Sequence, residues 1–252
     1  GRLACDRVGA GRMAEPAQIL AHIQSLLLLQ HKLDLQDKQI LISAGGTREY
    51  MDPVRLIGNP STGKMGVALA LAAHHRGATV TLVHGPMESS VLAPLADLER
   101  LQTLPVSSAI DMHQAMIQSL EAAHWIIMSA AVADVKPKDY HTTKLPKSSL
   151  PKALPLSPVP DIVADLGQRR QPQQRLIGFA AQTGDIVPPA LDKLKRKKLD
   201  AIAANPIDQT NSGFGSDQNH GIFIDVQGRQ QAIPSCSKLE WAHQLLDFIK
   251  AL

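Results

Sequence analysis

Residues Ile40–Gly66, ILISAGGTREYMDPVRLIGNPSTGKMG, limit the possible folds of this chain more than any other segment. The apolar run Ile40–Ala44 is typical of a buried strand, and it ends in two glycines. A second glycine-bearing stretch then opens a helix that we expect over Thr62–Arg76, ended by Gly77. Parallel α/β sheets present backbone N–H groups to phosphate in this way, because glycine permits close approach and the helix N-terminus carries partial positive charge.

The same alternation of strand and helix continues along the chain. Further strands are predicted at Thr79–His84, Arg100–Thr103, Trp125–Ser129, Leu176–Phe179 and Ala201–Ala204, and helices at Ser108–Ala123, Pro188–Lys198 and Ser237–Leu252. Gly221–Val226 and Gln230–Ile233 are separated by three residues and predict a hairpin. We therefore expect an α/β fold with a Rossmann-like, mostly parallel sheet, helices on both faces and an edge β-hairpin. Ligands of such sheets bind at the carboxyl ends of the strands.

Two segments lie outside this alternation. Residues 1–38 contain a glycine- and arginine-rich start, a helix expected over Ala17–Gln30 with one apolar face, and a polar linker. Residues 136–160 are rich in proline and lysine without a clear period, which predicts a loop. A loop of that length in a compact domain is usually functional or disordered.

Composition excludes several classes of protein. The net charge is only +3 and aromatic residues make up 3% of the chain, so a nucleic-acid partner is disfavoured. The strongest apolar run, Leu26–Leu29, is too short to span a bilayer. Cys5 and Cys236 are too far apart to suggest a disulfide framework, so a reduced, cytoplasmic setting is expected, with no membrane partner.

The stretch Gly58–Met65, GNPSTGKM, is close to a P-loop but one residue short, with Met65 where Ser or Thr would bind Mg²⁺. Around the helix start, Asn59 could hydrogen-bond a substrate while the helix N-terminus takes an anion. The alternative is an ordinary helix cap made by Ser61 or Thr62.

Three other groups of residues suggest nucleotide chemistry, and each has a plain structural alternative. Asp134, after the small residues that follow Ser129, could hold Mg²⁺ on a triphosphate or simply cap a turn. Lysines of the proline-rich segment could neutralise charge during phosphoryl or nucleotidyl transfer, or belong to a solvated linker: Lys136, Lys138, Lys144, Lys147 and Lys152. Lys193 and Lys197 share a helix face that could bind a ligand or only face solvent. Zinc-ligand spacings and a G-x-S-x-G motif are absent from the sequence.

Five segments resemble the bacterial phosphopantothenate–cysteine ligase family: AGGTREYMDPVRLIGNPSTGKMG, SAAVADVKPKDY, PDIV, IGFAAQT and KLKRKKLDAIAANP. The resemblance covers residues 39–252 and implies a ligase of coenzyme A biosynthesis. In that family the carboxylate of 4′-phosphopantothenate attacks CTP, and L-cysteine then displaces CMP from the acyl-cytidylate. The expected cofactor is Mg²⁺ with CTP, and the expected assembly is a homodimer, for which the hairpin near 221–233 is a candidate surface.

The resemblance also implies roles for individual residues. Asn59 and Lys144 would be catalytic, although Lys147 is close enough to leave the position of the loop lysine open. Asn59, Ser61, Thr62 and Gly63 would bind the acyl substrate, and Asp134 would hold Mg²⁺. The nucleotide would be contacted by Met128, Ser129, Ala130, Asp134, Lys144, Pro160, Asp161, Ile162, Val163, Phe179, Lys193 and Lys197. Lys64 is interpreted as structural support for the helix start.

The N-terminal piece GRLACDRVGAGRMAEPAQIL resembles the end of the FMN-dependent phosphopantothenoylcysteine decarboxylase domain that bacteria commonly fuse to the ligase. Residues 1–38 would then be a remnant of that domain and a linker, and the parent protein would be a bifunctional ligase and lyase. Cys5 matches a cysteine of that domain, and without the flavin-binding part we expect it to be inert. Two other hypotheses remain open. A nicotinamide-dependent oxidoreductase would have an acidic residue after the second strand, where this chain has His-Gly-Pro; a non-catalytic nucleotide-binding module would tolerate replacement of Asn59 and Lys144.

Overall fold

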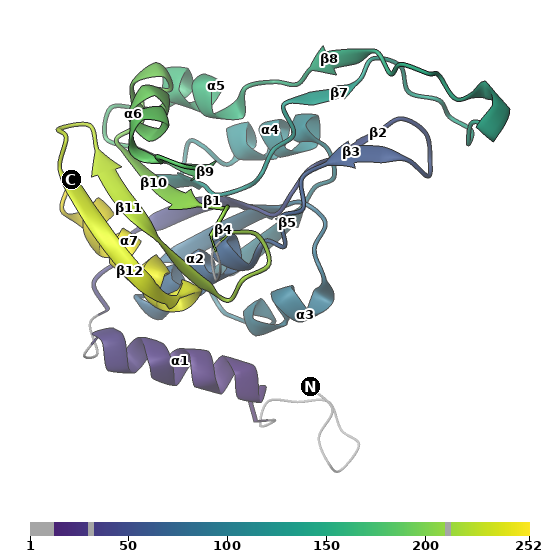
Figure 1. The fold of residues 1–252 in the computed structure, drawn as a ribbon. Helices are drawn as coiled ribbons and strands as arrows, with labels where there is room; N and C mark the ends of the chain where they lie inside the picture. Colours follow the sequence, from purple (N-terminus) through teal and green to yellow (C-terminus); the bar gives the residue numbers. More distant parts are fainter. Residues whose placement is uncertain (1–12, 30–32, 210–212) are drawn as a thin grey trace, which may run out of the picture.

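An eight-stranded sheet forms the centre of the molecule (Figure 1). The computed structural model describes residues 13–29, 33–209 and 213–252; Cys5 lies outside these ranges. In spatial order the strands are β12 (Gln230–Ser237), β11 (Gln218–Asp225), β10 (Ala201–Pro206), β9 (Arg175–Gln182), β6 (Trp125–Met128), β1 (Gln39–Ala44), β4 (Thr79–His84) and β5 (Leu101–Pro105). Within this sheet, the two pairings that involve β11 are antiparallel and the others are parallel. The mostly parallel α/β sheet with an edge hairpin is therefore confirmed.

Strand β1 shows why the centre of this sheet is stable. It pairs in parallel with β4 on one side and with β6 on the other, and all its residues after Gln39 are buried. Ile40 and Ile42 pack into one hydrophobic cluster and Leu41 into a second cluster on the opposite face. A strand covered on both faces needs a continuous apolar run, which is the pattern that the sequence shows here.

Helices cover both faces of the sheet. The first cluster joins it to α2 (Lys64–His75) and α7 (Lys238–Lys250), while the second joins it to α4 (Ala109–Gln118), α5 (Ile162–Arg169) and α6 (Val187–Arg196). Short α3 (Ser89–Leu92) and the 3₁₀ turn η1 (Ala93–Leu95) follow β4. The helix expected over Ser108–Ala123 ends at Gln118, and α5 was not expected at all.

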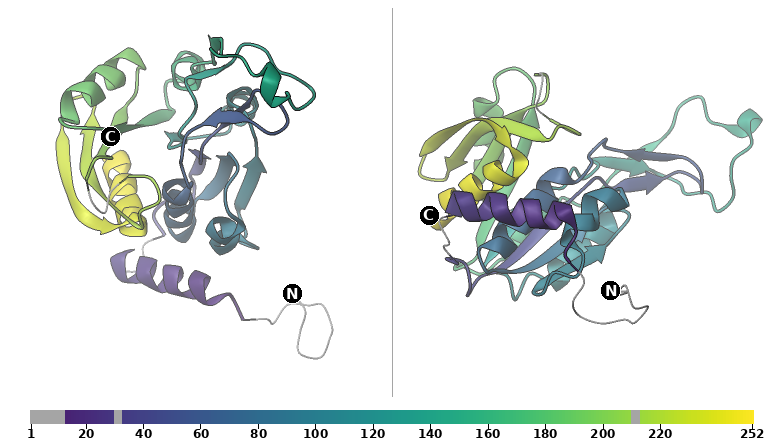
Figure 2. Two further views of the ribbon diagram at one scale, coloured as in Figure 1. Left: turned by 45° about the vertical axis from the view of Figure 1, so that its right-hand side comes forward. Right: turned by 90° about the horizontal axis from the view of Figure 1, so that it is seen from below.

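Two short antiparallel pairs project from the body as an arm (Figures 1 and 2). One pair is β2 (Arg48–Tyr50) with β3 (Leu56–Gly58), and the other is β7 (Val135–Pro137) with β8 (Leu156–Pro158). The prediction of an unstructured loop over 136–160 is thus wrong at both ends of that segment. Between them the chain has only the 3₁₀ turn η2 (Lys147–Ser149) as a regular element.

Helix α1 (Pro16–Leu29) packs beside α2 and α7, below the body in Figure 1. Its buried contact is polar: the hydroxyl of Ser25 hydrogen-bonds His75 Nδ1 at 2.7 Å and His243 Nε2 at 2.9 Å. The apolar face expected for this helix is present, but Leu20, Ile23 and other apolar side chains on it are exposed. Among the described helices, none combines the length and apolar character needed to cross a membrane.

Candidate active site

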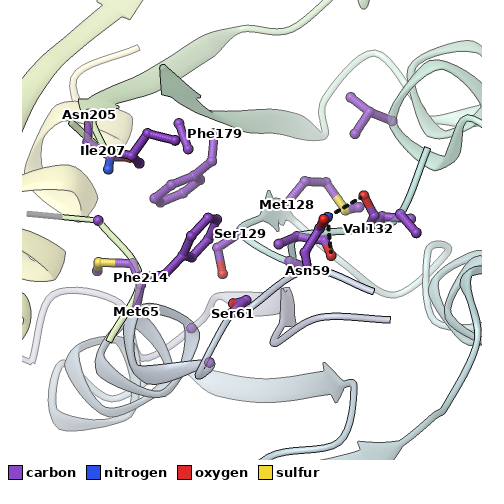
Figure 3. Close-up of a pocket in the computed structure, with 18 of the residues that line it drawn as sticks. Asn59, Ser61, Met65, Met128, Ser129, Val132, Phe179, Asn205, Ile207 and Phe214 are labelled. Atoms are coloured by element: carbon purple, nitrogen blue, oxygen red, sulfur yellow. Dashed lines mark hydrogen bonds between the residues drawn. The ribbon is translucent and has the colours of Figure 1, made fainter. Parts of the chain in front are cut away.

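A pocket of about 690 Å³ opens at the carboxyl ends of β6, β9 and β10 (Figure 3). Its wall comes from the start of α2, the turn after β6, the start of α5, helix α6, the segment before β11 and the start of α7. This is the edge at which an open parallel sheet binds its ligands. The structure therefore places the pocket where the sequence predicts it.

The turns under this edge are packed so closely that only glycine fits. A Cβ atom on Gly85, after β4, would lie 2.0 Å from the carbonyl oxygen of Gly46, which follows β1. A Cβ atom on Gly46 would lie 2.7 Å from the carbonyl oxygen of Asn59. The loop that carries Asn59 is thus supported directly by the turn after β1, with backbone against backbone.

The side chain of Asn59 joins the two loops that line one end of the pocket. Its amide nitrogen donates to the carbonyl oxygens of Ala131, at 3.2 Å, and Val132, at 3.1 Å (Figure 3). The turn after β6 is in turn attached to β1, because Ser129 Oγ donates to the carbonyl oxygen of Ser43 at 2.6 Å. These contacts hold Asn59 at the surface of the pocket with part of its amide available to a ligand.

Helix α2 begins without a cap at this point. Gly63 is the N-cap residue, with φ +77°, and no side chain of the described residues caps the helix. The first turn also carries no acidic residue. The alternative that Ser61 or Thr62 is an ordinary N-cap is therefore wrong, and the free N–H groups with their partial positive charge face the pocket, as in an anion site.

The opposite wall is formed by α5 and α6. Asp161 caps α5 by accepting from Ala164 N at 3.1 Å, and its carboxylate also pairs with Lys197. Lys193 donates to the carbonyl oxygen of Phe179 at 2.7 Å. Burial lowers the pKa of Lys193, and nearby Arg196 lowers it further. Both lysines of the predicted pair thus reach the pocket.

The structure brings together all but one of the residues predicted for the site. The pocket is lined by Asn59, Ser61, Thr62, Gly63, Met128, Ser129, Ala130, Asp134, Pro160, Asp161, Ile162, Val163, Phe179, Lys193 and Lys197. Lys144 does not line it, because it is an exposed residue of the arm between β7 and β8. Its neighbour Leu145 is held there by Asp52, which accepts from Leu145 N at 3.2 Å.

Comparisons with known proteins assign the chain that forms this pocket to a family. Residues 35–252 match the DNA/pantothenate metabolism flavoprotein C-terminal domain. The chain belongs to this family. It is 39% identical over 252 residues to the coenzyme A biosynthesis bifunctional protein CoaBC of Bacillus subtilis (strain 168), and 40% identical over 254 residues to that of Vibrio vulnificus (strain YJ016). Both alignments cover the whole of this chain and 61% of the relative.

A solved structure agrees with this assignment. The crystal structure of the C-terminal domain of a coenzyme A biosynthesis bifunctional protein CoaBC superposes with a TM-score of 0.71 at 36% identity. The superposition covers 86% of this chain and 96% of that domain. The part of the chain that matches the family, residues 35–252, contains both the central sheet and the pocket.

Sequence reasoning missed several pocket residues in this member of the family. They come from β10, from the segment before β11, from β11 itself and from α7: Asn205, Phe214, Asn219 and Lys238. One signal was available for Lys238. A lysine at the first position of a helix opposes the helix dipole, so its presence there suggests a second role.

Proposed function

We propose that this chain ligates 4′-phosphopantothenate and L-cysteine at the expense of CTP, through an acyl-cytidylate, as a step of coenzyme A biosynthesis. The observation that carries the proposal is one pocket, in a chain of this family, that combines the uncapped start of α2, Asn59 and the Lys193–Lys197 pair. The names of the CoaBC relatives support a role in coenzyme A biosynthesis.

The first step needs a carboxylate and a triphosphate side by side. A carboxylate oxygen of phosphopantothenate attacks the α-phosphorus of CTP, and the bond from that phosphorus to the bridging oxygen breaks, so pyrophosphate leaves with the electron pair. Lys193 and Lys197 would neutralise charge on the nucleotide. Asn59, held by the carbonyl oxygens of Ala131 and Val132, would orient the acyl group.

The second step forms the amide. The cysteine amine, after losing a proton, attacks the acyl carbonyl carbon, and the bond to the phosphate oxygen breaks to release CMP. Until then the mixed anhydride must be shielded from water. We assign this shielding, and stabilisation of the developing charge, to the arm segment that carries Lys144, acting when the arm is closed over a pocket.

Mg²⁺ fits this site as a companion of the nucleotide. Asp134 is an exposed carboxylate on the pocket wall, and no group of three or more metal-ligating side chains occurs among the described residues. In proteins, the ligands of Mg²⁺ are usually one or two carboxylates together with substrate phosphates and water. Bound there, the ion would supply charge neutralisation for departing pyrophosphate, with Asp134 as its protein ligand.

The remaining proposals concern the longer protein. The chain spans 61% of the length of these relatives, and we propose that residues 1–38 end an FMN-dependent decarboxylase domain in which Cys5 is inert without the flavin-binding part. We further propose a cytoplasmic homodimer. A decarboxylase assay on this chain that shows turnover would contradict the assignment of Cys5.

Pyrophosphate release tests the reaction. The unmodified chain, supplied with CTP, phosphopantothenate, L-cysteine and Mg²⁺, should release pyrophosphate and form a stoichiometric amount of phosphopantothenoylcysteine. Asn59→Asp and Lys144→Gln should each lower turnover by about a hundredfold, because each removes a group that acts in the transition state. Lys147→Gln is the matched control for the loop lysine. Release no faster than background by the unmodified chain would rule out the ligase. Full turnover by both variants would instead contradict the assignment of Asn59 and Lys144 as catalytic residues.

A further inference from the structure

Thr47 is a buried threonine between β1 and β2, and the proposed function leaves it without a role. The residue is 1% exposed. Its hydroxyl oxygen accepts a hydrogen bond from Ala133 N at 3.0 Å, and Ala133 lies shortly before β7. The contact therefore joins the segments that lead into two strands of the arm, β2 and β7, at the edge of the pocket that Ala133 lines.

The turn between β6 and β7 is attached to the body at several successive residues. Ala131 N donates to the carbonyl oxygen of Gly45 at 2.8 Å. Asn59 donates to the carbonyl oxygens of Ala131 and Val132. The next attachment along the chain is the hydrogen bond to Thr47. It fixes the end of the turn, beyond the two carbonyl groups that Asn59 binds.

Asp134 is the residue that this attachment places. It follows Ala133 directly and is an exposed residue on the pocket wall. Burial and Arg196 lower the pKa of Lys193, and the charge of Asp134 opposes them, so the carboxylate and the ammonium act on the same part of the pocket. An exposed carboxylate is not fixed by packing, and its position depends on the backbone that carries it.

The hydroxyl of Thr47, and not only its shape, is needed for this placement. Valine has the same shape but no acceptor, so it would leave the buried N–H group of Ala133 without a partner. Thr47 itself cannot follow a shift of Ala133, because its carbonyl oxygen is packed against Gly58: a Cβ atom on Gly58 would lie 2.7 Å from that oxygen. The turn would therefore move instead, and Asp134 with it.

We propose that Thr47 is a positioning residue for the divalent cation of the nucleotide, and that it acts through Asp134. The proposal rests on the proposed function for the ion and for CTP. Groups that hold a metal ligand in place commonly determine how well the metal binds, and their replacement lowers the affinity about tenfold to a hundredfold. Thr47 does this through the backbone, since its hydrogen bond is made to the residue before the carboxylate.

The test measures how much Mg²⁺ tightens the binding of CTP when no turnover takes place. CTP is titrated into the chain by calorimetry with Mg²⁺ and again with EDTA, without phosphopantothenate, and the ratio of the two Kd values is the metal-dependent gain. Thr47→Val should lower this gain about tenfold and leave the Kd in EDTA unchanged. Thr47→Ser keeps the hydroxyl and should keep the gain within about twofold. Thr81→Val is the matched control, at a half-buried threonine of β4 outside the described pocket wall.

A double-mutant cycle shows whether Thr47 acts through Asp134. Asp134→Asn alone should lower the gain, because it removes the carboxylate that Mg²⁺ prefers as a ligand. If Thr47 acts only by placing that carboxylate, Thr47→Val in the Asp134→Asn chain should lower the gain by no more than about twofold further. A full additional loss in the double variant would mean that Thr47 acts independently of Asp134, and the proposal would be wrong.

The single variants decide the proposal as well. An unchanged gain in Thr47→Val, or an equal loss in Thr81→Val, would contradict it, and so would a loss of the gain in Thr47→Ser. If Thr47→Val does not fold, Thr47→Ala removes the same oxygen without adding an atom, and the same ratio of Kd values decides.

The outcome for the ligase reaction is separate, because CTP binding needs no turnover. A lower gain in Thr47→Val, together with pyrophosphate release no faster than background by the unmodified chain, would keep the positioning role and remove the ligase. Full turnover without a metal-dependent gain in the unmodified chain would keep the ligase and remove the positioning role.

Discussion

At the scale of single residues, Lys193 is the side chain whose surroundings most clearly indicate a role. A lysine that faces only solvent keeps its ammonium in water, whereas Lys193 donates to the carbonyl of Phe179 at 2.7 Å and has its pKa lowered by burial. A partly buried cation that contacts one carbonyl oxygen and lies on a pocket wall is arranged for an anionic ligand.

Lys193→Met should therefore raise KM for CTP about tenfold while leaving the fold intact, because methionine replaces the apolar stem but removes the charge-assisted contact. Steady-state kinetics at fixed phosphopantothenate and L-cysteine measure this change. Lys195 is exposed on the same helix, and Lys195→Met should leave KM for CTP unchanged. Equal effects of the two variants would mean that α6 contributes only general positive charge.

The sequence predicted 15 of the 32 residues on the pocket wall, and the residues it missed have a physical explanation. Asn59 and Lys193 lie in local patterns, a strand–glycine–helix segment and an i, i+4 pair. Asn219 and Lys238 reach the pocket only because β11 and α7 return to the sheet after a reversal of chain direction. Long-range packing of that kind leaves no periodic signal in a single sequence.

At the scale of elements, the arm is anchored by one turn. Asp52 accepts from the N–H groups of Val54 and Arg55, each at 2.8 Å, and from Leu145 N at 3.2 Å. Arg55 in turn donates to the carbonyl oxygen of Leu145 at 3.3 Å. Both backbone groups of the residue after Lys144 are thus held by the β2–β3 hairpin, which makes Asp52 a positioning residue for the lysine segment.

Asp52→Asn should loosen that segment, since an amide cannot accept all of these N–H groups. We expect faster tryptic cleavage at Lys144 and Lys147, and a kcat about fivefold to tenfold lower with KM for CTP unchanged. Exposed Asp139→Asn is the control. Burial raises the pKa of Asp52, but the N–H donors and Arg55 outweigh it and hold the pKa at about 2, so the anchor should persist until the pH falls toward that value. Unchanged cleavage and kcat would show that the anchor does not position Lys144.

Helix α1 is joined to the body by a cluster that should respond to acid. Burial lowers the pKa of His75 to about 3, with His22 and His74 nearby, and lowers the pKa of His243 to about 4, where Arg76 adds to the effect and Asp34 opposes it. Below about pH 6.5 the unfolded chain therefore binds protons that the folded chain does not bind. The free energy of unfolding falls as the pH drops from 6.5 toward 4.

We expect the free energy of unfolding to be about 1–2 kcal/mol lower per histidine at pH 5 than at pH 7.5. Urea unfolding at the two pH values measures it, and replacement of both His75 and His243 by Gln should flatten the difference. The neighbouring carboxylate of Asp34 does not contribute in this range, because its pKa is lowered and it loses its charge below this window. A pH-independent free energy in the unmodified chain would contradict the explanation.

The sequence predicted some helices and strands closely and missed others. Strands β1 and β6 carry apolar runs and β4 is rich in β-branched residues, and all three were found within a residue or two of their expected ends. Strands β2, β3, β7 and β8 have three residues each, too few for any periodicity, and exist because they pair with one another. Helix α5 is only eight residues long and follows a proline-rich segment, so the sequence pattern does not show where it begins.

For the whole molecule, two features bear on domain organisation. The pocket draws every described wall residue from positions 59–238, and the family match begins at residue 35. Helix α1 lies before both, packs through polar contacts and presents apolar side chains to solvent. The domain boundary near residue 38 stays a prediction, and this division implies that α1 is not needed for the proposed ligase pocket.

A chain that begins at Leu33 should therefore fold and keep ligase turnover within about twofold of the full chain, since Asp34 remains to pair with Arg76 at 2.7 Å. Removal of α1 also takes away the Ser25 hydroxyl and lets water reach His75 and His243, so their pKa values should return toward 6.5. The shortened chain should consequently lose little stability between pH 7.5 and pH 5, where the full chain loses a few kcal/mol. Parallel urea titrations and pyrophosphate-release assays on both chains measure the two effects. Lost turnover in a folded, shortened chain would show that α1 supports the site, and an unchanged acid response would place the titrating groups elsewhere in the body.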